Sequence, residues 1–564
     1  MPHESQKVNC QNCKNNFVIE PDDFSFYEKI KVPPPTFCPE CRMIRRLVFR
    51  NERRLFKVQD YFTKKNIFSI FPKESERKVI TQEEWFSDDW DAMDYARPYD
   101  FSRSFFEQIL ELSKDVPIYG LNVKNMINSD YCANASDLKN CYLVFNSNFT
   151  EDSMYGNGVD SSKDCVDNSN ISESERCYET FWLNKCYQCY YSIMCVDSYN
   201  LWFSRDCLGC NDCFGCTNLR KSSYCIFNKQ YSKEEYFEKL KEFKLDTREG
   251  INKARELARE FWKKQPNKYH QGLKNLNATG SYVSHSKNIK EGYLIRESEN
   301  MKYCQYMLVP KNKDCMDVSV WGQNTELCYE TSVCGESAYN TKFSWDCWPN
   351  TVNVEYSISI KSSSDCFGCV GLRNRQYCIL NKQYSKEEYF EMLEKIKLHM
   401  NEMPYIDKKG NIYKYGEFFP VEFSPYGYNN TAAQDQVPLN KEQALENHYP
   451  WLDIEKGEYA ITINAKDLPQ NIMEVDDSIT NEVIACGRCN FAYRITTSEL
   501  NFYRKEKLPL PDLCIECRYN RRISDRLKVK LYKRNCNKCS IEIMTGFSED
   551  EIVYCEKCYQ AEVY

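Results

Sequence analysis

The chain has 564 residues, 32 of them cysteine, and a formal net charge of −7 at pH 7. This length allows three or four domains, each with a core of its own. The negative charge excludes a uniformly basic nucleic-acid binder, but local basic clusters can still act, because salt screens charges beyond about 8 Å.

The N-terminus predicts the cellular compartment. Residues 1–7 are polar and lack the apolar core of a signal peptide, and no stretch approaches the roughly 20 apolar residues of a membrane span. We therefore expect a cytoplasmic protein without membrane contact. In that reducing compartment, paired cysteines indicate metal binding more often than disulfides.

Two C-x2-C pairs open the chain, and the same module recurs near the C-terminus, followed by a further set. Two such knuckle turns present four thiolates to a tetrahedral zinc ion and leave no position open for water. The sequence therefore predicts three structural zinc sites. The predicted ligands are Cys10, Cys13, Cys38 and Cys41; Cys486, Cys489, Cys514 and Cys517; and Cys536, Cys539, Cys555 and Cys558.

A rubredoxin-like iron site is the competing interpretation of these pairs. Such sites favour a small residue after the second cysteine of each knuckle. The two copies of the duplicated module carry larger residues at these positions, which favours zinc: Lys14, Arg42, Asn490 and Arg518.

Residues 59–90 keep traces of a second N-terminal ribbon. Aligned with the C-terminal modules, its four ligand positions have become Asp60, Thr63, Thr81 and Glu84. Threonine is a poor zinc ligand, so we expect no metal here. We expect this segment to be held by packing around Phe62, Phe68, Phe71 and Trp85.

A run of arginines follows each duplicated module at helical spacing. Rows of guanidinium groups beside a rigid zinc site suit contact with phosphates, mainly those of a nucleic-acid backbone. The alternative is a solvated helix face paired with nearby acids. The candidate binding residues are Arg42, Arg45, Arg46, Arg50, Arg53 and Arg54 in one run, and Arg518, Arg521, Arg522 and Arg526 in the other.

The middle of the chain is a second duplication with a shorter period inside it. Cys177-Tyr-Glu-Thr returns at Cys328, and Cys213-Phe-Gly-Cys returns at Cys366. In the first copy, cysteines recur at multiples of twelve, with polar turns between them. We interpret twelve residues as half a coil of a β-solenoid whose cysteines form core ladders. A plain antiparallel sheet is the alternative.

Four cysteines in the first copy have closer spacing, at Cys207, Cys210, Cys213 and Cys216. This spacing is similar to a ferredoxin run, although the last step is shorter and no proline follows. Buried thiol packing is the favoured interpretation, and a metal or iron–sulfur cluster is the alternative.

The predicted fold is mainly β with short helices: four-cysteine ribbons at both ends flank two duplicated, cysteine-rich, β-solenoid-like domains. Capping boxes at Ser232 and Ser385 predict a helix after each solenoid. The expected segments are a zinc ribbon with a basic helix (1–58), a metal-less ribbon (59–90), a helical linker (91–131), solenoid A (132–230), a helical cap (231–279), solenoid B (280–383), a capping helix (384–400), an aromatic and proline-rich connector (401–480), a second ribbon with a basic helix (481–534) and a last ribbon (535–564).

Residues 10–46 and 486–522 resemble the probable zinc-ribbon domain family, a small bacterial treble-clef-like module. The resemblance rests on the cysteine pairs, the Phe26-Tyr27 and Phe502-Tyr503 steps, the prolines and the C-x2-C-R-x2-R-R ending. It implies a fold and a metal but no activity. The whole chain also resembles large uncharacterised bacterial proteins that place such ribbons around a cysteine-rich middle.

These observations predict a non-enzymatic zinc-binding scaffold that docks RNA, the ribosome or protein partners through its arginine-rich ribbons. One alternative is a protein–protein adaptor whose arginines meet acidic proteins. Another is an enzyme with a site in the solenoid groove or a metal cluster at Cys207–Cys216. No phosphate loop or dinucleotide fingerprint is present.

Overall fold

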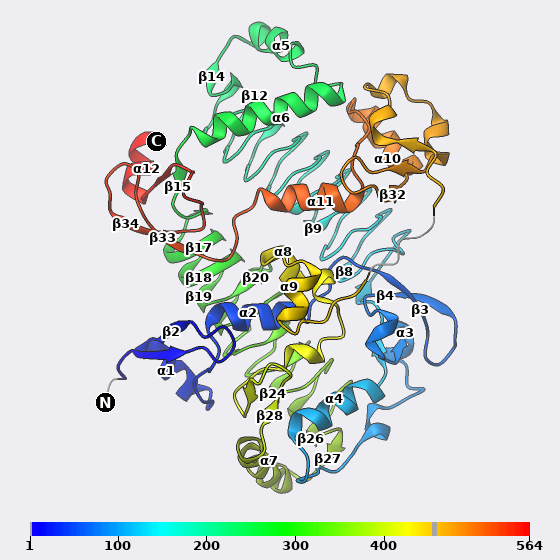
Figure 1. The fold of residues 1–564 in the computed structure, drawn as a ribbon, viewed down its shortest axis with the longest axis vertical. Coiled ribbons are helices and arrows are strands. Elements are labelled where there is room, and N and C mark those ends of the chain that lie inside the picture. The colour runs from blue at the N-terminus through cyan, green and yellow to red at the C-terminus, as the bar shows by residue number, and fades with distance from the viewer. Residues whose placement is uncertain (1–2, 324, 454–458, 564) are drawn as a thin grey trace.

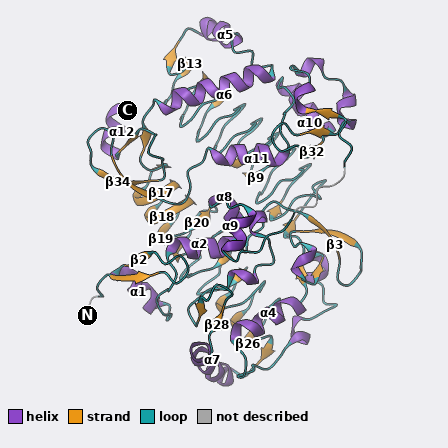
Figure 2. Cartoon of the chain, in the orientation of Figure 1, coloured by secondary structure: helices purple, strands orange, loops and turns teal. Residues whose placement is uncertain are grey.

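The computed structural model describes residues 3–323, 325–453 and 459–563. Figure 1 shows two stacks of short strands, the first in cyan and the second in green, with helices from both ends of the chain laid across them. Figure 2 shows that strands and loops dominate and that the helices are short. The predicted class, mainly β with two solenoid domains between terminal ribbons, is confirmed.

The first solenoid consists of parallel strands that pair with a register of twelve residues, such as Ser169 with Asn157 and Cys225 with Cys213. Parallel pairing excludes the antiparallel alternative. Its strands are β7 (Val123–Lys124), β8 (Ala135–Ser136), β9 (Asn157–Asp160), β10 (Ser169–Ser172), β11 (Tyr199–Trp202), β12 (Asn211–Phe214) and β13 (Ser223–Ile226), with β14 (Lys229–Gln230) added antiparallel.

The register corrects the predicted length of a coil. Twelve residues make a whole coil, and the prediction of half a coil is wrong. The chain turns at every third residue, where φ is positive, so each coil has four short sides. Asparagine and aspartate tolerate this left-handed conformation better than most residues, and they occupy many of these corners: Asn125, Asn128, Asn134, Asp137, Asn140, Asn146 and Asp152.

The cysteine ladder faces the interior of the coils, as predicted. Cys177 and Cys189 are fully buried, and Cys213 pairs directly with Cys225 on the next coil. The thiols donate to backbone carbonyls, as Cys186 Sγ does to the Cys195 carbonyl at 3.4 Å. These cysteines are therefore small core residues that also satisfy backbone acceptors.

The second solenoid follows the same plan with less regular coils. Its ladder steps by twelve residues from Ile358 to Val370, by thirteen from Ser332 to Trp345 and by fourteen from Glu299 to Lys313. These insertions explain its looser cysteine rhythm. Its strands are β16 (Gly272–Leu273), β17 (Leu276–Ser284), β18 (Lys287–Arg296), β19 (Glu299–Lys302), β20 (Gln305–Met307), β21 (Lys313–Met316), β22 (Ser332–Cys334), β23 (Trp345–Cys347), β24 (Val352–Glu355), β25 (Ser364–Phe367), β26 (Gln376–Ile379) and β27 (Lys382–Gln383).

Helices close the solenoids and join them. Both predicted capping boxes are present, at Ser232 with Glu235 and at Ser385 with Glu388. The first solenoid begins near Val123, inside the segment predicted as a helical linker, and the second begins near Gly272. The helices outside the ribbons are α4 (Phe105–Asp115), α5 (Lys233–Lys241), α6 (Arg248–Lys263), α7 (Lys386–Glu402), α8 (Ala432–Gln436) and α9 (Lys441–Glu446).

Each ribbon is a hairpin or short strand pair followed by a helix. The N-terminal pair comprises β1 (Gln6–Asn9), β2 (Asn16–Ile19), α1 (Pro21–Lys29) and α2 (Pro39–Leu47), then β3 (Phe56–Gln59), β4 (Asn66–Ser69), β5 (Val79–Ile80), which pairs with β6 (Ile118–Tyr119), and α3 (Gln82–Phe86). The C-terminal pair comprises β31 (Ile484–Ala485), β32 (Ala492–Tyr493), α10 (Thr497–Glu506) and α11 (Ile515–Ser524), then β33 (Tyr532–Asn535), β34 (Glu542–Thr545), β35 (Val553–Tyr554) and α12 (Glu556–Val563).

The connector packs tightly despite its few regular elements, which are β28 (Tyr405–Ile406), β29 (Ile412–Tyr413) and β30 (Ile463–Asn464) with α8 and α9. Phe418 and Phe419 are buried, and Phe418 contacts Phe49 with ring centroids 5.5 Å apart. The connector thus fills the space beside the N-terminal ribbon.

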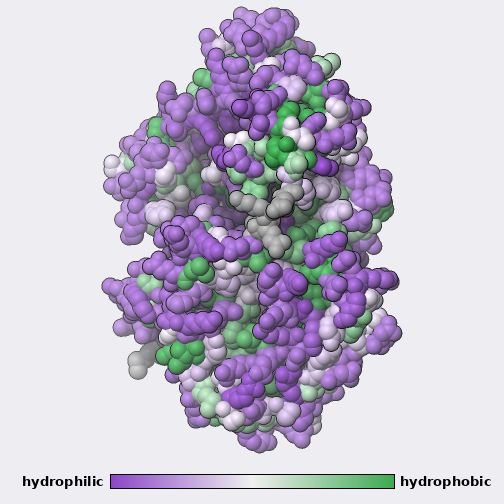
Figure 3. Space-filling model, turned by 45° about the vertical axis from the view of Figure 1, so that its right-hand side comes forward, coloured by the Kyte–Doolittle hydropathy of each residue, from purple (hydrophilic) through white to green (hydrophobic). Residues whose placement is uncertain are grey.

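The last ribbon meets the start of the second solenoid, where β35 pairs with β15 (Asn267–Lys268). Figure 3 shows one face of the molecule, which is largely hydrophilic with scattered apolar residues.

Candidate metal centres and arginine docking helices

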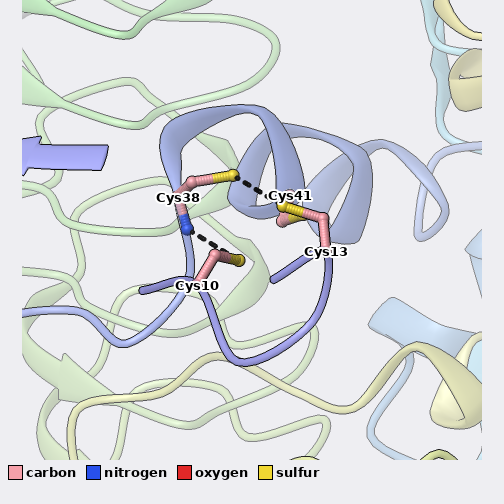
Figure 4. Close-up of side chains that lie close together, drawn as sticks. All are labelled: Cys10, Cys13, Cys38 and Cys41. Atoms are coloured by element: carbon pink, nitrogen blue, oxygen red, sulfur yellow. Dashed lines mark hydrogen bonds between the residues drawn. The ribbon is translucent and has the colours of Figure 1, made fainter. Parts of the chain in front are cut away.

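The three predicted cysteine sets each come together in space. In the first, Cys10 and Cys13 lie on the turn after β1, and Cys38 and Cys41 lie at the start of α2 (Figure 4). The four sulfur atoms of each set lie within 4.8 Å of one another. This is the arrangement of a closed four-sulfur shell that can hold one metal ion.

Backbone N–H groups point at one sulfur of each set and favour its thiolate. The amide of Cys38 donates to Cys10 Sγ at 3.3 Å, and the amide of Cys555 donates to Cys536 Sγ at 3.2 Å. Burial opposes ionisation of Cys536, but the amides of Cys555, Cys539 and Lys538 outweigh it and lower the pKa of this thiol to about 6. The same balance lowers the pKa of Cys486 to about 7. The residues present therefore fit a metal cation.

The metal-less ribbon keeps the shape of its neighbours through hydrogen bonds. Asp60 takes the place of the first cysteine, and its carboxylate accepts from the amides of Phe62 and Thr63 at 2.9 and 2.7 Å and from the amide of Thr81 at 3.1 Å. Glu84 accepts from Thr81 in turn. Phe71 and Trp85 are buried as predicted, but Phe62 and Phe68 are 42% and 36% exposed, so they do not form the core of this ribbon.

The predicted cationic face of the first ribbon does not exist, because its arginines point inward onto the second solenoid. Arg42, Arg45 and Arg46 are at most 1% exposed. Arg42 Nε donates to Asp317 at 2.7 Å, and Arg46 Nη1 lies 3.5 Å from the same carboxylate. Arg45 pairs with Glu330, which comes from the next coil.

The second ribbon repeats this arrangement on the first solenoid. Arg518 Nε lies 3.2 Å from Asp167, and Arg522 Nη1 donates to Asp167 at 2.7 Å. Arg521 pairs with Glu179, which again comes from the next coil. Each ribbon helix therefore lies on a solenoid from the other half of the chain; Figure 1 shows α2 over the green coils and α11 over the cyan coils.

The remaining arginines of the two runs are also in ion pairs. Arg50 lies 3.3 Å from Glu52, and Arg526 lies 3.8 Å from Asp435. Arg53 and Arg54 both reach Glu516, at 3.2 and 3.0 Å, and so connect the two ribbons. Six of the ten arginines are therefore not on exposed faces, because buried acids of distant coils neutralise them: Arg42, Arg45, Arg46, Arg518, Arg521 and Arg522. The other four pair with acids outside the coils, and the Arg54 side chain keeps 31% of its surface exposed.

Sequence reasoning missed the acids that receive these arginines: Asp167, Glu179, Asp317 and Glu330. The signal was present, because Glu179 and Glu330 occupy the same place in the duplicated Cys-Tyr-Glu-Thr motif. A charged residue repeated beside an apolar ladder in both solenoids, with a repeated arginine helix at both ends, indicates mutual recognition.

The four cysteines at Cys207–Cys216 lie on successive sides of the coils and are all buried. Cys207 Sγ donates to the Arg205 carbonyl and Cys210 Sγ to the Leu208 carbonyl, both at 3.5 Å. Among the described residues, these four sulfur atoms do not form one of the sets within metal-binding distance. Their contacts are those of core thiols.

Among the described residues, no helix has both the length and the apolar composition needed to cross a bilayer. Comparison with family models, curated proteins and solved structures found nothing that matches this chain.

Proposed function

We propose that the chain is a non-enzymatic zinc-binding scaffold in which terminal ribbons lock two β-solenoids into one body. Zinc is the metal that an all-cysteine tetrahedral shell favours, and the bulky residues after the knuckles argue against a rubredoxin-like iron centre. In this proposal the metal shapes the start of α2 and α11, and those helices then present their arginines to the solenoids.

The observation that carries the proposal is the pair of shared carboxylates. Asp317 lies between Arg42 and Arg46, and the equivalent Asp167 lies between Arg518 and Arg522, with the carboxylates fully buried. Buried ions are tolerated only when they are paired in good geometry. Two copies of one such contact support a role in holding the architecture together.

This proposal changes the part that the arginines play. Docking of RNA, the ribosome or an acidic protein through them would require their release from the solenoids. RNA that co-purifies with the wild type, and is lost from an Arg42→Glu, Arg45→Glu, Arg46→Glu variant that still folds, would favour the RNA-docking hypothesis instead.

The test combines metal analysis with hydrogen exchange. We expect three zinc ions per chain, and we expect a strong chelator to raise amide exchange in α2 and α11 before it does so in the solenoid coils. The control variant is Arg504→Met. It removes an arginine of the second ribbon that lies on α10 and pairs with the exposed Asp477, not with a solenoid. Iron in place of zinc, or helices that stay protected after metal loss, would contradict the proposal.

A further inference from the structure

A pocket of about 330 Å³ lies between the two solenoids. One wall comes from coils of the first solenoid and the facing wall from coils of the second. Arg50 and Arg526, which follow the two docking helices, also line it. This volume falls within the range of small-molecule sites, and the junction of two domains is a common place for them.

The wall from the first solenoid presents a column of asparagines, of which the last three are left-handed corners: Asn122, Asn134, Asn146 and Asn170. Within the described part of the chain, the side chains of Asn122, Asn134 and Asn170 make no hydrogen bond, and Asn134 Nδ2 is buried without a partner. A primary amide donates and accepts at once, so it suits a hydroxyl group. Asn134 Nδ2 therefore leaves one buried donor for a ligand, and the half-buried amides of Asn122 and Asn170 can also bind it.

Gly158 interrupts this column of asparagines, and the Asn170 side chain lies against it. It pairs with Asn170 in the coil register and has φ +71°, like the asparagines above and below it. A Cβ at this position would lie 2.8 Å from Asn170 Nδ2. The Asn170 amide therefore lies against Gly158, and a side chain at this position would have to displace it from the wall of the pocket.

The facing wall is aromatic and aliphatic. Trp321 and Trp348 meet edge to face with ring centroids 4.3 Å apart, and Val320 and Val333 lie beside them. Trp348 Nε1 donates to Asp346 at 2.8 Å, which fixes its ring. Indole rings offer large, rigid surfaces at low entropic cost, and their faces attract the polarised C–H groups of a ligand.

Several charges around the pocket are already paired within the protein. Arg50 lies 3.3 Å from Glu52, Asp346 lies 3.7 Å from Lys361, and Arg526 lies 3.8 Å from Asp435. A charged ligand would have to compete with these pairs. Lys124, Asp160 and Glu336 also line the pocket and form no ion pair among the described residues, but Lys124 and Glu336 are exposed and opposite in charge, and Asp160 accepts hydrogen bonds from Asn148. Lys361 already covers one face of Trp348, with its Nζ 3.8 Å from the ring centroid. Because the lining has no excess of positive charge, its amides and remaining aromatic surface favour a neutral polar molecule over a phosphate.

We infer that this pocket binds a neutral saccharide of one or two rings. A sugar ring has apolar C–H faces and a rim of hydroxyl groups, so it matches one aromatic wall and one amide wall. The inference goes beyond the scaffold proposed above: the scaffold concerns what holds the solenoids together, and the pocket concerns what they recognise.

The test uses the full-length, metal-loaded protein and three sets of probes: neutral mono- and disaccharides, uronic or sialic acid sugars, and mononucleotides. Binding is measured by calorimetry and ligand-observed NMR. We expect at least one neutral saccharide to bind and the charged sugars and nucleotides to bind at least tenfold more weakly. No binding by any neutral saccharide, or preferential binding of nucleotides, would overturn the inference.

Three variants locate the site. Trp321→Ala and Asn134→Ala should each weaken binding at least tenfold. Gly158→Asn should abolish it by displacing the Asn170 amide, and its backbone conformation is one that the neighbouring asparagines already adopt. Asn128→Ala is the matched control, because Asn128 is an exposed corner of the same solenoid and pairs with Asn140.

A thermal melt of each variant separates loss of fold from loss of binding. If Trp321→Ala does not fold, Gly158→Asn and Asn134→Ala still decide the question. Full affinity in both of these variants would place the saccharide elsewhere and overturn the inference. Because ligand affinity and metal content are measured separately, failure here leaves the scaffold proposal standing.

Discussion

Asp167 and Asp317 have the same role in the two solenoids: each carboxylate pairs with two arginines, one helical turn apart, on a ribbon from the opposite half of the chain. Aromatic contacts repeat as well, since Tyr27 packs on Tyr329 at 5.2 Å and Tyr503 on Tyr178 at 5.6 Å. The duplication has thus preserved a complete interface, including its polar centre and its apolar surroundings.

The two members of this ion pair should be energetically coupled. Arg518→Met and Asp167→Asn each leave an uncompensated buried group, which costs about 3–5 kcal/mol. The double variant should cost clearly less than the sum of the two, because the Arg518–Asp167 interaction is lost only once; Arg522 and Glu499 still lose a partner. Denaturant unfolding of the four proteins in the cycle measures this difference. Additive losses would mean that the two groups do not interact.

The acids of the neighbouring coil should respond to pH in opposite ways. Burial raises the pKa of Glu330 to about 7, with Arg45 opposing the rise and the second carboxylate, Glu417, adding to it. Glu179 is equally buried, but Arg521 and Arg255 both face it, and its pKa is lowered. Glu330 shares Arg45 with Glu417, whereas Glu179 has both Arg521 and Arg255 as partners.

The sign of the effect follows from these directions. A raised carboxyl pKa contributes stability below about pH 4.5, and this contribution is lost as pH rises through about 7. Relative to a Glu330→Gln variant, the wild type should therefore lose about 2–3 kcal/mol between pH 5 and pH 8. Glu179→Gln is the comparator: a lowered carboxyl pKa contributes stability above about pH 4.5 and loses it as pH falls below that, so the wild type should keep a constant advantage over this variant between pH 5 and pH 8. Equal pH profiles for the two variants, measured by urea unfolding, would contradict this prediction.

The metal-less ribbon should accept a metal when its ligands are restored. Asp60, Thr63, Thr81 and Glu84 already hold the knuckle and helix start together through hydrogen bonds. Changing all four to cysteine should raise the zinc content by one ion per chain. The double variant Asp60→Cys, Thr63→Cys should not, because two thiolates do not complete the shell. Elemental analysis of purified protein distinguishes the two results, and unchanged zinc in the fourfold variant would show that the backbone has diverged.

Cysteine substitutions should separate the two uses of thiols in this chain. Cys514→Ser should remove one metal ion and expose α11 to proteolysis. Cys213→Ser, in the core ladder, should leave the metal content unchanged and act only on solenoid stability. Metal loss in the Cys213 variant would instead favour a cluster at Cys207–Cys216.

The repeats predicted the solenoids, the ribbons and the buried cysteine ladder, because each depends on local spacing. The predicted coil length is wrong because the sides of a coil are shorter than an ordinary strand of about five residues. The corners at Asn134, Asp137 and Asn140 make each side far shorter. Corner residues every third position were visible, but only their left-handed conformation identifies them as corners.

The burial of the arginines could not be read from local sequence. The helical spacing of Arg42, Arg45 and Arg46 was correct, but their partners lie more than 250 residues away. An arginine-rich helix face looks the same in sequence whether it meets water, phosphate or a buried carboxylate. The pocket between the solenoids depends on the same long-range arrangement and leaves no local motif.

The crosswise docking has a consequence for how the chain is made. The first solenoid can complete its coils early in synthesis, yet Asp167 stays without its arginines, and Glu179 has only Arg255, until residues 518–522 have been translated. The N-terminal ribbon likewise waits for the coils that carry Asp317 and Glu330. A chain whose synthesis stops before residue 518 therefore leaves Asp167 and Glu179 without the arginines of α11. We expect such a chain to be recognised and degraded as unfinished.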